Sequence, residues 1–154
     1  MKDIAPNLNK VPDKMPKRRS NLVVSAIFRD GDRVLLLKRQ NTSYFSGHYC
    51  LVNGSVDEGE SVVDALVREC REEVGVIVDP DDVRIYRVSD EYKFNGYIVF
   101  VFDVMKWSGD ILNNEPDKHS EIIWADINNL PENIIPAHKA ILRNLKVDGF
   151  KIFY

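Results

Sequence analysis

Short runs of aliphatic and β-branched residues, separated by polar turns, recur along this chain. Residues 22–28 and 34–37 form two such runs, joined by Arg-Asp-Gly-Asp, in which Asp-Gly is a common hairpin signal. The runs at 83–88 and 97–104 have the same character, and the second is apolar enough to be a central strand of a sheet. The pattern therefore predicts an antiparallel pair of strands from the first two runs and further strands from the other two.

A different period begins after Ser61. Apolar positions there recur every three or four residues, as on one face of a helix: Val63, Leu66 or Val67, Cys70 and Val74. Gly75 follows this stripe and is typical of the residue that ends a helix. A second helix is expected at 136–145, where Pro136 suits the first turn.

The remaining segments are shorter or less regular. Residues 49–52 and 121–125 predict two short strands, and a polar loop is expected at 113–120. Residues 1–20 contain three prolines and six basic residues, so we expect an extended N-terminal arm there, followed by a single domain at 21–154.

The composition is that of a soluble globular protein. Of the 154 residues, 44% are hydrophobic and 29% are charged, which suits one buried core. The net charge of −3 provides no field that attracts a nucleic-acid polymer. No run is long and apolar enough to cross a membrane, and none forms a secretory signal. We therefore expect a cytoplasmic protein without a membrane partner.

Cysteine chemistry is not expected in this protein. Cys50 and Cys70 each lie in an apolar stretch, which favours reduced core residues over a disulfide. A catalytic thiol is disfavoured because His48, His119 and His138 show no arrangement that suggests a base for it. The candidate chemistry therefore comes from other side chains.

Three glutamates crowd the first predicted helix. Glu69, Glu72 and Glu73 are spaced by three and four residues, which places their carboxylates on one side within a turn. Like charges at this spacing repel one another unless a cation lies between them, and carboxylate oxygens suit Mg²⁺ or Mn²⁺. The alternative is a solvated acidic face in which Arg68 and Arg71 are the partners.

These glutamates belong to a longer pattern at 54–76, which reads GSVDEGESVVDALVRECREEVGV. It resembles the Nudix box, G-x5-E-x7-R-E-U-x-E-E-x-G-U, in which U is aliphatic. Eight positions match: Gly54, Glu60, Arg68, Glu69, Glu72, Glu73, Gly75 and Val76. Cys70 departs at the first U position, where a small hydrophobe still packs. Seven fixed residues coincide by chance on the order of once in 10⁸ starting points, so the metal site is favoured over the acidic face.

The resemblance implies a fold and a metal site. The fold is α+β, an α/β/α sandwich with a mixed β-sheet between helices and the box's loop and helix at one edge. The ion is Mg²⁺, with Mn²⁺ as a substitute, and its expected ligands are carboxylates and a main-chain carbonyl: Glu69, Glu72, Glu73, Asn53 or Gly54, and Glu115. Three box residues are expected to hold this arrangement in place: Glu60, Arg68 and Gly75.

The resemblance also implies hydrolysis at phosphorus, in which one carboxylate accepts a proton from the attacking water. Glu69 is the favoured base, and Glu72 or a loop carboxylate is the alternative. Arg39 and its neighbour Lys38 follow the second strand, where similar enzymes place a cation on the substrate phosphates, although a surface cation is an equal alternative. Four aromatic residues are candidates for stacking on a base, but core positions are favoured for them: Tyr44, Phe45, Tyr49 and Trp124.

The substrate is expected to be a small-molecule nucleotide with a diphosphate linked to another group. A nucleoside triphosphate, including oxidised or noncanonical ones, is favoured, giving a monophosphate and pyrophosphate as MutT-like enzymes do. ADP-ribose is disfavoured because Glu91 stands where enzymes acting on it tend to carry proline. Enzymes acting on dinucleoside polyphosphates favour a tyrosine near the position of Tyr92, so these substrates are the alternative, together with nucleotide sugars. A sensor that binds a nucleotide without cutting it is a further alternative. The basic arm and residues 150–154 are candidate contacts of a homodimer.

Overall fold

The computed structural model describes residues 20–91, 96–145 and 151–153, with no side-chain description for the last range. Its helices are α1 (Val62–Val74) and α3 (Pro136–Arg143), with a short 3₁₀ turn at Pro80–Asp82. The strands are β1 (Asn21–Asp30), β2 (Arg33–Arg39), β3 (Tyr49–Cys50), β4 (Val52–Ser55), β5 (Val83–Glu91), β6 (Tyr97–Val104), β7 (His119–Asp126) and β8 (Lys151–Phe153). The expected N-terminal arm and the dimer contacts fall outside the residues whose side chains are described.

The sheet is mixed, as expected. The strands run in the order β3-β2-β1-β6-β5-β8, while β4 also pairs with β1 and β7 with β2. β1 is parallel to β6 and antiparallel to β2 and β4. The apolar run at 97–104 forms β6 and lies between β1 and β5, which confirms it as a central strand.

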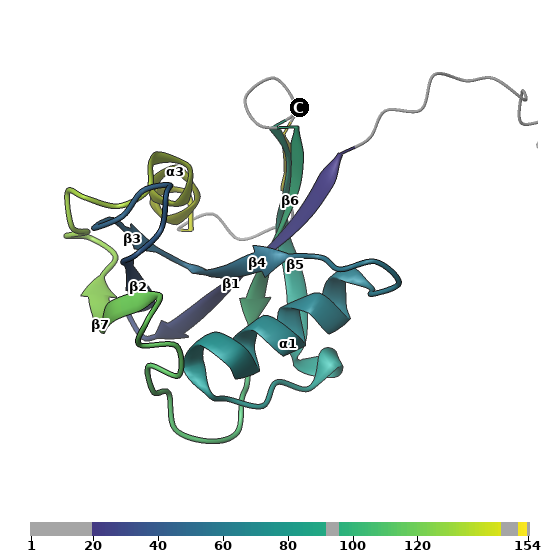
Figure 1. Cartoon of the computed structure of the whole chain (residues 1–154), viewed down its shortest axis with the longest axis horizontal. Helices are drawn as coiled ribbons and strands as arrows, with labels where there is room; N and C mark the ends of the chain where they lie inside the picture. The colour runs from purple at the N-terminus through teal and green to yellow at the C-terminus, as the bar shows by residue number, and fades with distance from the viewer. Residues whose placement is uncertain (1–19, 92–95, 146–150, 154) are drawn as a thin grey trace, which may run out of the picture.

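Two hydrophobic clusters cover the two faces of this sheet. The helices α1 and α3 lie on different sides of it (Figure 1). Side chains alternate between them along a strand, so that Leu35 and Leu37 pack in the cluster of α1 and Leu36 packs in the cluster of α3. α1 contributes Leu66 and Cys70 to its cluster and α3 contributes Ile141 and Leu142, among others. Because each helix buries its apolar face on a different side, the architecture is the expected α/β/α sandwich.

The first helix begins and ends where its sequence predicts. The Ser61 hydroxyl accepts a hydrogen bond of 3.1 Å from the Asp64 N–H and so caps the N-terminus. Gly75 adopts a left-handed conformation, φ 73°, and its N–H donates to the Arg71 carbonyl at the C-terminus. These two caps fix which residues of α1 face the sheet.

Other element ends differ from the sequence prediction by a few residues. β7 begins at His119 instead of Glu121, because the backbone of His119 still pairs with Arg39 of β2 across a register shift. α3 ends at Arg143, where Asn144 takes a non-helical conformation. Such ends are set by pairing with distant segments and by capping, which the local pattern does not encode.

Both cysteines are buried and free, as the sequence predicts. Burial raises the pKa of Cys50 to about 12 and raises that of Cys70 well above its ordinary value. Neither thiol is therefore suited to form the thiolate that a nucleophile requires. Within the described part of the chain, neither helix has the length and apolar character needed to span a bilayer.

Candidate active site

The three glutamates of α1 lie at different depths. Glu73 has 8% of its side chain exposed, and its Oε2 accepts a hydrogen bond of 3.0 Å from the Asn53 N–H of β4. Glu69 is 13% exposed, whereas Glu72 is 48% exposed. The packing of α1 on β4 therefore turns Glu73 and Glu69 toward the sheet edge and leaves Glu72 near solvent.

Gly54 makes this close approach possible. A Cβ atom on Gly54 would lie 1.9 Å from Oε1 of Glu69, which is far inside van der Waals contact. The Glu69 carboxylate therefore rests directly over the Gly54 backbone of β4. This is the position at which the Nudix resemblance expects a glycine and a main-chain carbonyl ligand.

Arg68 holds the N-terminal part of the box together. Its Nε donates to Oε1 of Glu60 at 2.8 Å and its Nη2 to Oε2 of Glu60 at 3.0 Å, which makes a bidentate pair. The same Nη2 donates to the Ser55 carbonyl at 2.9 Å. Nη1 reaches Glu69 at 2.6 Å and Glu72 at 3.2 Å. One guanidinium thus joins β4, the loop before α1 and the helix itself.

A second group of polar side chains lies at the C-terminal part of α1. Glu73, Glu115 and His119 offer ligand atoms that all lie within 4.8 Å of one another. The loop before β7 is tied to the helix, because the Asn114 N–H donates to the Glu73 carbonyl at 3.0 Å. Lys118 Nζ pairs with Oε1 of Glu115 at 2.6 Å. We call Glu73, Glu115 and His119 the Glu73 corner.

Burial and like charges disfavour the ionised forms of the inner carboxylates. The pKa of Glu73 is raised to about 8, first by burial and then by the negative charges of Glu69 and Glu115, although the Asn53 N–H opposes this. Burial also raises the pKa of Glu69, against the lowering effect of Arg68. In contrast, the Arg68 guanidinium lowers the pKa of Glu60.

These residues fit a divalent cation. Carboxylate oxygens are the ligands that Mg²⁺ and Mn²⁺ prefer, and a bound cation would favour the ionised forms that burial opposes. The structure brings expected ligands together from three segments, namely Glu69 and Glu73 of α1, the Asn53–Gly54 backbone of β4 and the loop that carries Glu115. Glu72 instead pairs with Arg68 at 3.2 Å, nearer to solvent. The identity of the ion stays a prediction.

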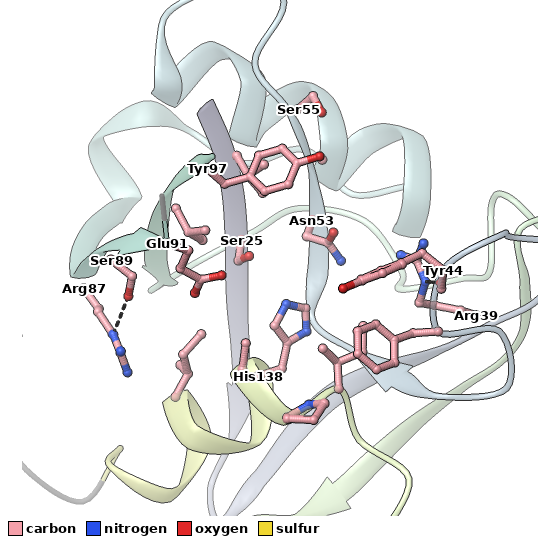
Figure 2. A pocket seen from close by; sticks show the side chains of 18 of the residues that line it. Ser25, Arg39, Tyr44, Asn53, Ser55, Arg87, Ser89, Glu91, Tyr97 and His138 are labelled. Atoms are coloured by element: carbon pink, nitrogen blue, oxygen red, sulfur yellow. Dashed lines mark hydrogen bonds between the residues drawn. The ribbon is translucent and has the colours of Figure 1, made fainter. Parts of the chain in front are cut away.

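A cavity of about 870 Å³ adjoins the box at Asn53 and Gly54 (Figure 2). Arg39 lines it, and its Nε donates to the Tyr44 carbonyl at 3.1 Å. Lys38 is not among the residues that line the cavity. Its Nζ instead pairs with Glu121 at 3.0 Å. Of the two cations expected to contact substrate, the structure thus places Arg39 beside the cavity, and the role of Lys38 stays a prediction.

The four aromatic candidates divide between the cavity and the core. Tyr44 and Phe45 line the cavity and contact one another edge to face, with ring centroids 4.6 Å apart. Tyr49 is buried in the cluster of α3, and Trp124 packs against the cluster of α1. Only the first pair is therefore placed where it can stack on a ligand.

Two cavity residues were not expected from the sequence. Ser25 of β1 is fully buried, and its hydroxyl has no hydrogen-bond partner among the described residues. His138 points toward the cavity, and its Nδ1 accepts a hydrogen bond of 3.0 Å from the Leu51 N–H. Burial lowers the pKa of His138 to about 4, so its ring is neutral and its other nitrogen carries the hydrogen. No local sequence signal distinguishes either residue from an ordinary strand or helix position.

Known proteins share both the sequence and the fold. The family model for the NUDIX domain matches residues 17–145. An ADP-ribose pyrophosphatase of Methanocaldococcus jannaschii is 32% identical over 123 residues, which cover 78% of this chain and 70% of that protein. Nucleoside triphosphatase NudI of Salmonella typhimurium is 29% identical over 141 residues, covering 83% of this chain and 99% of NudI.

A solved structure agrees with these sequence matches. The crystal structure of a MutT NUDIX hydrolase from Burkholderia pseudomallei superposes with a TM-score of 0.73 and 25% identity, covering 82% of this chain and 98% of that one. The matched region contains the whole box together with α1, β4 and the Glu73 corner. The chain therefore belongs to the Nudix hydrolase family.

Proposed function

We propose that this protein uses a divalent cation to hydrolyse a phosphoanhydride bond in a nucleoside diphosphate that is linked to another group. The preferred substrate class is a nucleoside triphosphate, oxidised or noncanonical ones included, which gives a monophosphate and pyrophosphate. The observation that carries the proposal is the position of Gly54, which lies under the Glu69 carboxylate and also lines the cavity. A nucleotide in this cavity would therefore bring its phosphates to the carboxylates of the box.

The chain's carboxylates would hold the cation. Candidate ligands are the box glutamates, the loop carboxylate and a main-chain carbonyl: Glu69, Glu72, Glu73, Glu115, and Asn53 or Gly54. When bound, Mg²⁺ or Mn²⁺ neutralises phosphate oxygens and makes a coordinated water more acidic. Arg39, which also lines the cavity, would contact the phosphates.

The proton of the attacking water needs an acceptor. The water oxygen forms a bond to phosphorus, the bond from that phosphorus to the bridging oxygen breaks, and the leaving nucleoside monophosphate or pyrophosphate keeps the electron pair. Glu69 is the favoured acceptor because it is mostly buried beside Gly54 and its pKa is raised, which suits proton transfer near neutral pH. Glu72 remains the alternative, although it lies nearer to solvent.

ADP-ribose is the second candidate substrate. It is favoured by the name of the Methanocaldococcus jannaschii relative, an ADP-ribose pyrophosphatase. Against it stands Glu91, which replaces the proline expected for that class and which lines the cavity. Tyr92, on which the dinucleoside polyphosphate alternative depends, lies outside the described residues. The nucleoside triphosphate remains our first choice, in agreement with the near-complete coverage of NudI.

A substrate panel tests the proposal. Purified protein is assayed with Mg²⁺, with Mn²⁺ and with a chelator against nucleoside triphosphates, ADP-ribose, nucleotide sugars and dinucleoside polyphosphates, and products are identified by ³¹P NMR. We expect cation-dependent release of pyrophosphate from a nucleoside triphosphate. Release of AMP and ribose 5-phosphate from ADP-ribose alone would move the assignment to the second candidate. Tight binding of a panel member without any turnover would contradict hydrolysis and favour the sensor.

A further inference from the structure

His119 lies beside two carboxylates of the candidate cation site. It is the first residue of β7 and follows the loop of Glu115, and its N–H donates to the Glu115 carbonyl at 3.0 Å. This short backbone loop holds the two residues side by side. The side chain of His119 is 3% exposed, so its position is fixed by the surrounding protein and not by solvent.

The ring of His119 lacks a hydrogen bond at either nitrogen in the described part of the chain. Nδ1 is buried and has no partner. Nε2 lies 3.6 Å from Oε1 of Glu73, which is longer than the roughly 2.7–3.2 Å of an N–H···O hydrogen bond. Buried polar atoms in proteins almost always have a partner. Nε2 is the ring nitrogen that faces Glu73, at a distance that fits two ligands of one ion better than a direct hydrogen bond.

The Glu73 carboxylate, which faces His119, uses only one of its two oxygens in a hydrogen bond within the described part of the chain. Oε2 of Glu73 accepts the Asn53 N–H, whereas Oε1 faces His119 without a hydrogen bond. Oε1 of Glu115 accepts from Lys118. The three ligand atoms of the corner lie within 4.8 Å of one another, close to the roughly 4 Å that separates opposite ligands of one small divalent ion.

We infer that Nε2 of His119 is a nitrogen ligand of the divalent cation held by Glu73 and Glu115, and that it makes this site prefer Mn²⁺ to Mg²⁺. Imidazole nitrogen is a good ligand for transition-metal ions, whereas Mg²⁺ favours oxygen ligands alone. The inference extends the proposed function, because it concerns the cation that the proposed hydrolysis uses. The box implies a site made of oxygen ligands. The inference adds His119, which lies 43 residues beyond Val76, the last residue of the box.

The alternative for His119 is a positioning role. If Nε2 carries the hydrogen, His119 donates to Glu73 and orients that carboxylate without touching the ion. Both roles would lower activity on substitution, so activity does not separate them. A measurement of the atoms bound to the ion does.

Pulsed EPR of Mn²⁺-loaded protein tests the assignment. We expect the electron-spin-echo modulation to show one directly bound ¹⁴N, which changes to the ¹⁵N pattern when only histidine is ¹⁵N-labelled. The coupling should vanish in His119→Gln and persist in the matched control His48→Gln, whose ring contacts Phe45 and which does not belong to the Glu73 corner. Absence of nitrogen coupling in the wild-type protein, or its survival in His119→Gln, would overturn the inference.

Calorimetry gives a second, independent readout. His119→Gln should weaken Mn²⁺ binding by about tenfold or more, with a smaller loss for Mg²⁺, so the preference for Mn²⁺ falls. An equal loss for both ions would contradict a nitrogen ligand and favour the positioning role. Should His119→Gln fail to fold, the labelled wild-type spectrum together with His48→Gln and His138→Gln still assigns or excludes His119.

The outcomes also separate this inference from the proposed function. Nucleotide turnover in a protein that shows no nitrogen coupling would overturn only the role of His119. Nitrogen coupling in a protein that turns over no member of the substrate panel would support His119 as a ligand and overturn only the proposed hydrolysis.

Discussion

The carboxylates around α1 lie in two contrasting environments. On the Arg68 side, a single guanidinium pairs with Glu60, Glu69 and Glu72, and the pKa of Glu60 is lowered. In the Glu73 corner, burial and neighbouring negative charges raise the pKa of Glu73 to about 8. The same helix thus carries Glu69 and Glu72, which pair with Arg68, and Glu73, which has no cationic group at hydrogen-bond distance among the described residues.

This difference indicates which part of the box is architecture and which part awaits a ligand. An acid paired with arginine is stabilised whether or not a metal ion is present. A buried acid without a positively charged partner disfavours its own ionised form, and a bound cation removes that penalty. Arg68 and Glu60 should therefore respond to mutation mainly through stability, whereas Glu69 and the Glu73 corner should respond mainly through cation binding and catalysis.

The largest effect is expected for the inner carboxylates. Glu69→Gln and Glu73→Gln should each lower kcat by about 10²- to 10⁴-fold, because they remove a proton acceptor or a metal ligand from a nearly isosteric side chain. Steady-state turnover of the best panel substrate measures this, with circular dichroism to check the fold. Glu58→Gln, in the exposed loop before the helix, is the matched control. Wild-type turnover in both inner variants would refute the assigned chemistry.

Gly54→Ala should have the next largest effect. The new Cβ would meet the Glu69 carboxylate at 1.9 Å, so the side chain or β4 must move. A displacement of about 1 Å at a reacting group can cost roughly 10²-fold in rate, and we expect a loss of that size. The control is Glu58→Ala, in the exposed loop after β4. If Gly54→Ala retains full kcat, the close approach of Glu69 to the backbone has no role in turnover.

Arg68→Lys tests the architectural side. Lysine keeps the charge but cannot make the bidentate pair with Glu60 or reach all of its other acceptors, so we expect a loss of about 2 kcal/mol in the free energy of unfolding. Urea denaturation measures this change. The exposed Arg33–Asp30 pair is the control, for which Arg33→Lys should change stability by less than about 1 kcal/mol. Equal effects at both sites would remove the distinction between a structural pair and a surface pair.

The smallest effect concerns acid stability and His138, a half-buried residue of the cavity wall. Its folded pKa of about 4 lies below the ordinary 6.5, so the folded state binds the proton more weakly than the unfolded state. The stability linked to His138 is therefore complete above pH 6.5 and is lost as the pH falls toward 4. Because the ring is partly exposed, we expect a loss of about 1–2 kcal/mol.

Denaturation of wild type and His138→Gln at pH 7 and pH 4.5 isolates this contribution. The variant should lose less stability on acidification than the wild type, by the amount given above. His48→Gln, at a residue that does not line the cavity, serves as the control. An identical pH dependence in wild type and His138→Gln would show that the ring titrates normally in the folded protein.

The sequence predicted most of the fold because the relevant signals are local. Ser61 and Gly75 mark the ends of α1, and the alternating runs mark β1, β2 and β6. The helical spacing also placed the box glutamates on one side. It did not predict that Glu73 is buried while Glu72 remains half-exposed, since that depends on how α1 packs on β4.

The histidines were missed for a related reason. His119 reaches the corner because β7 pairs with β2, some 80 residues earlier in the chain, and Arg39 and His119 are partners in that register. His138 receives its hydrogen bond from Leu51 of a segment 87 residues away. Contacts at such separations are set by topology, and neither residue stands in a local pattern that indicates chemistry.

A cation titration of thermal stability tests the contrast between the two environments most directly. At pH 7.5 a bound cation would favour the ionised form of the Glu73 carboxylate. Mn²⁺ or Mg²⁺ at about 100 times Kd should therefore raise the wild-type Tm by roughly 5–10 °C. Arg68→Lys should start from a lower Tm and show a similar rise, whereas Glu73→Gln should show almost none. A wild-type Tm that does not respond to either ion, or an equal response in Glu73→Gln, would contradict a cation site at the Glu73 corner.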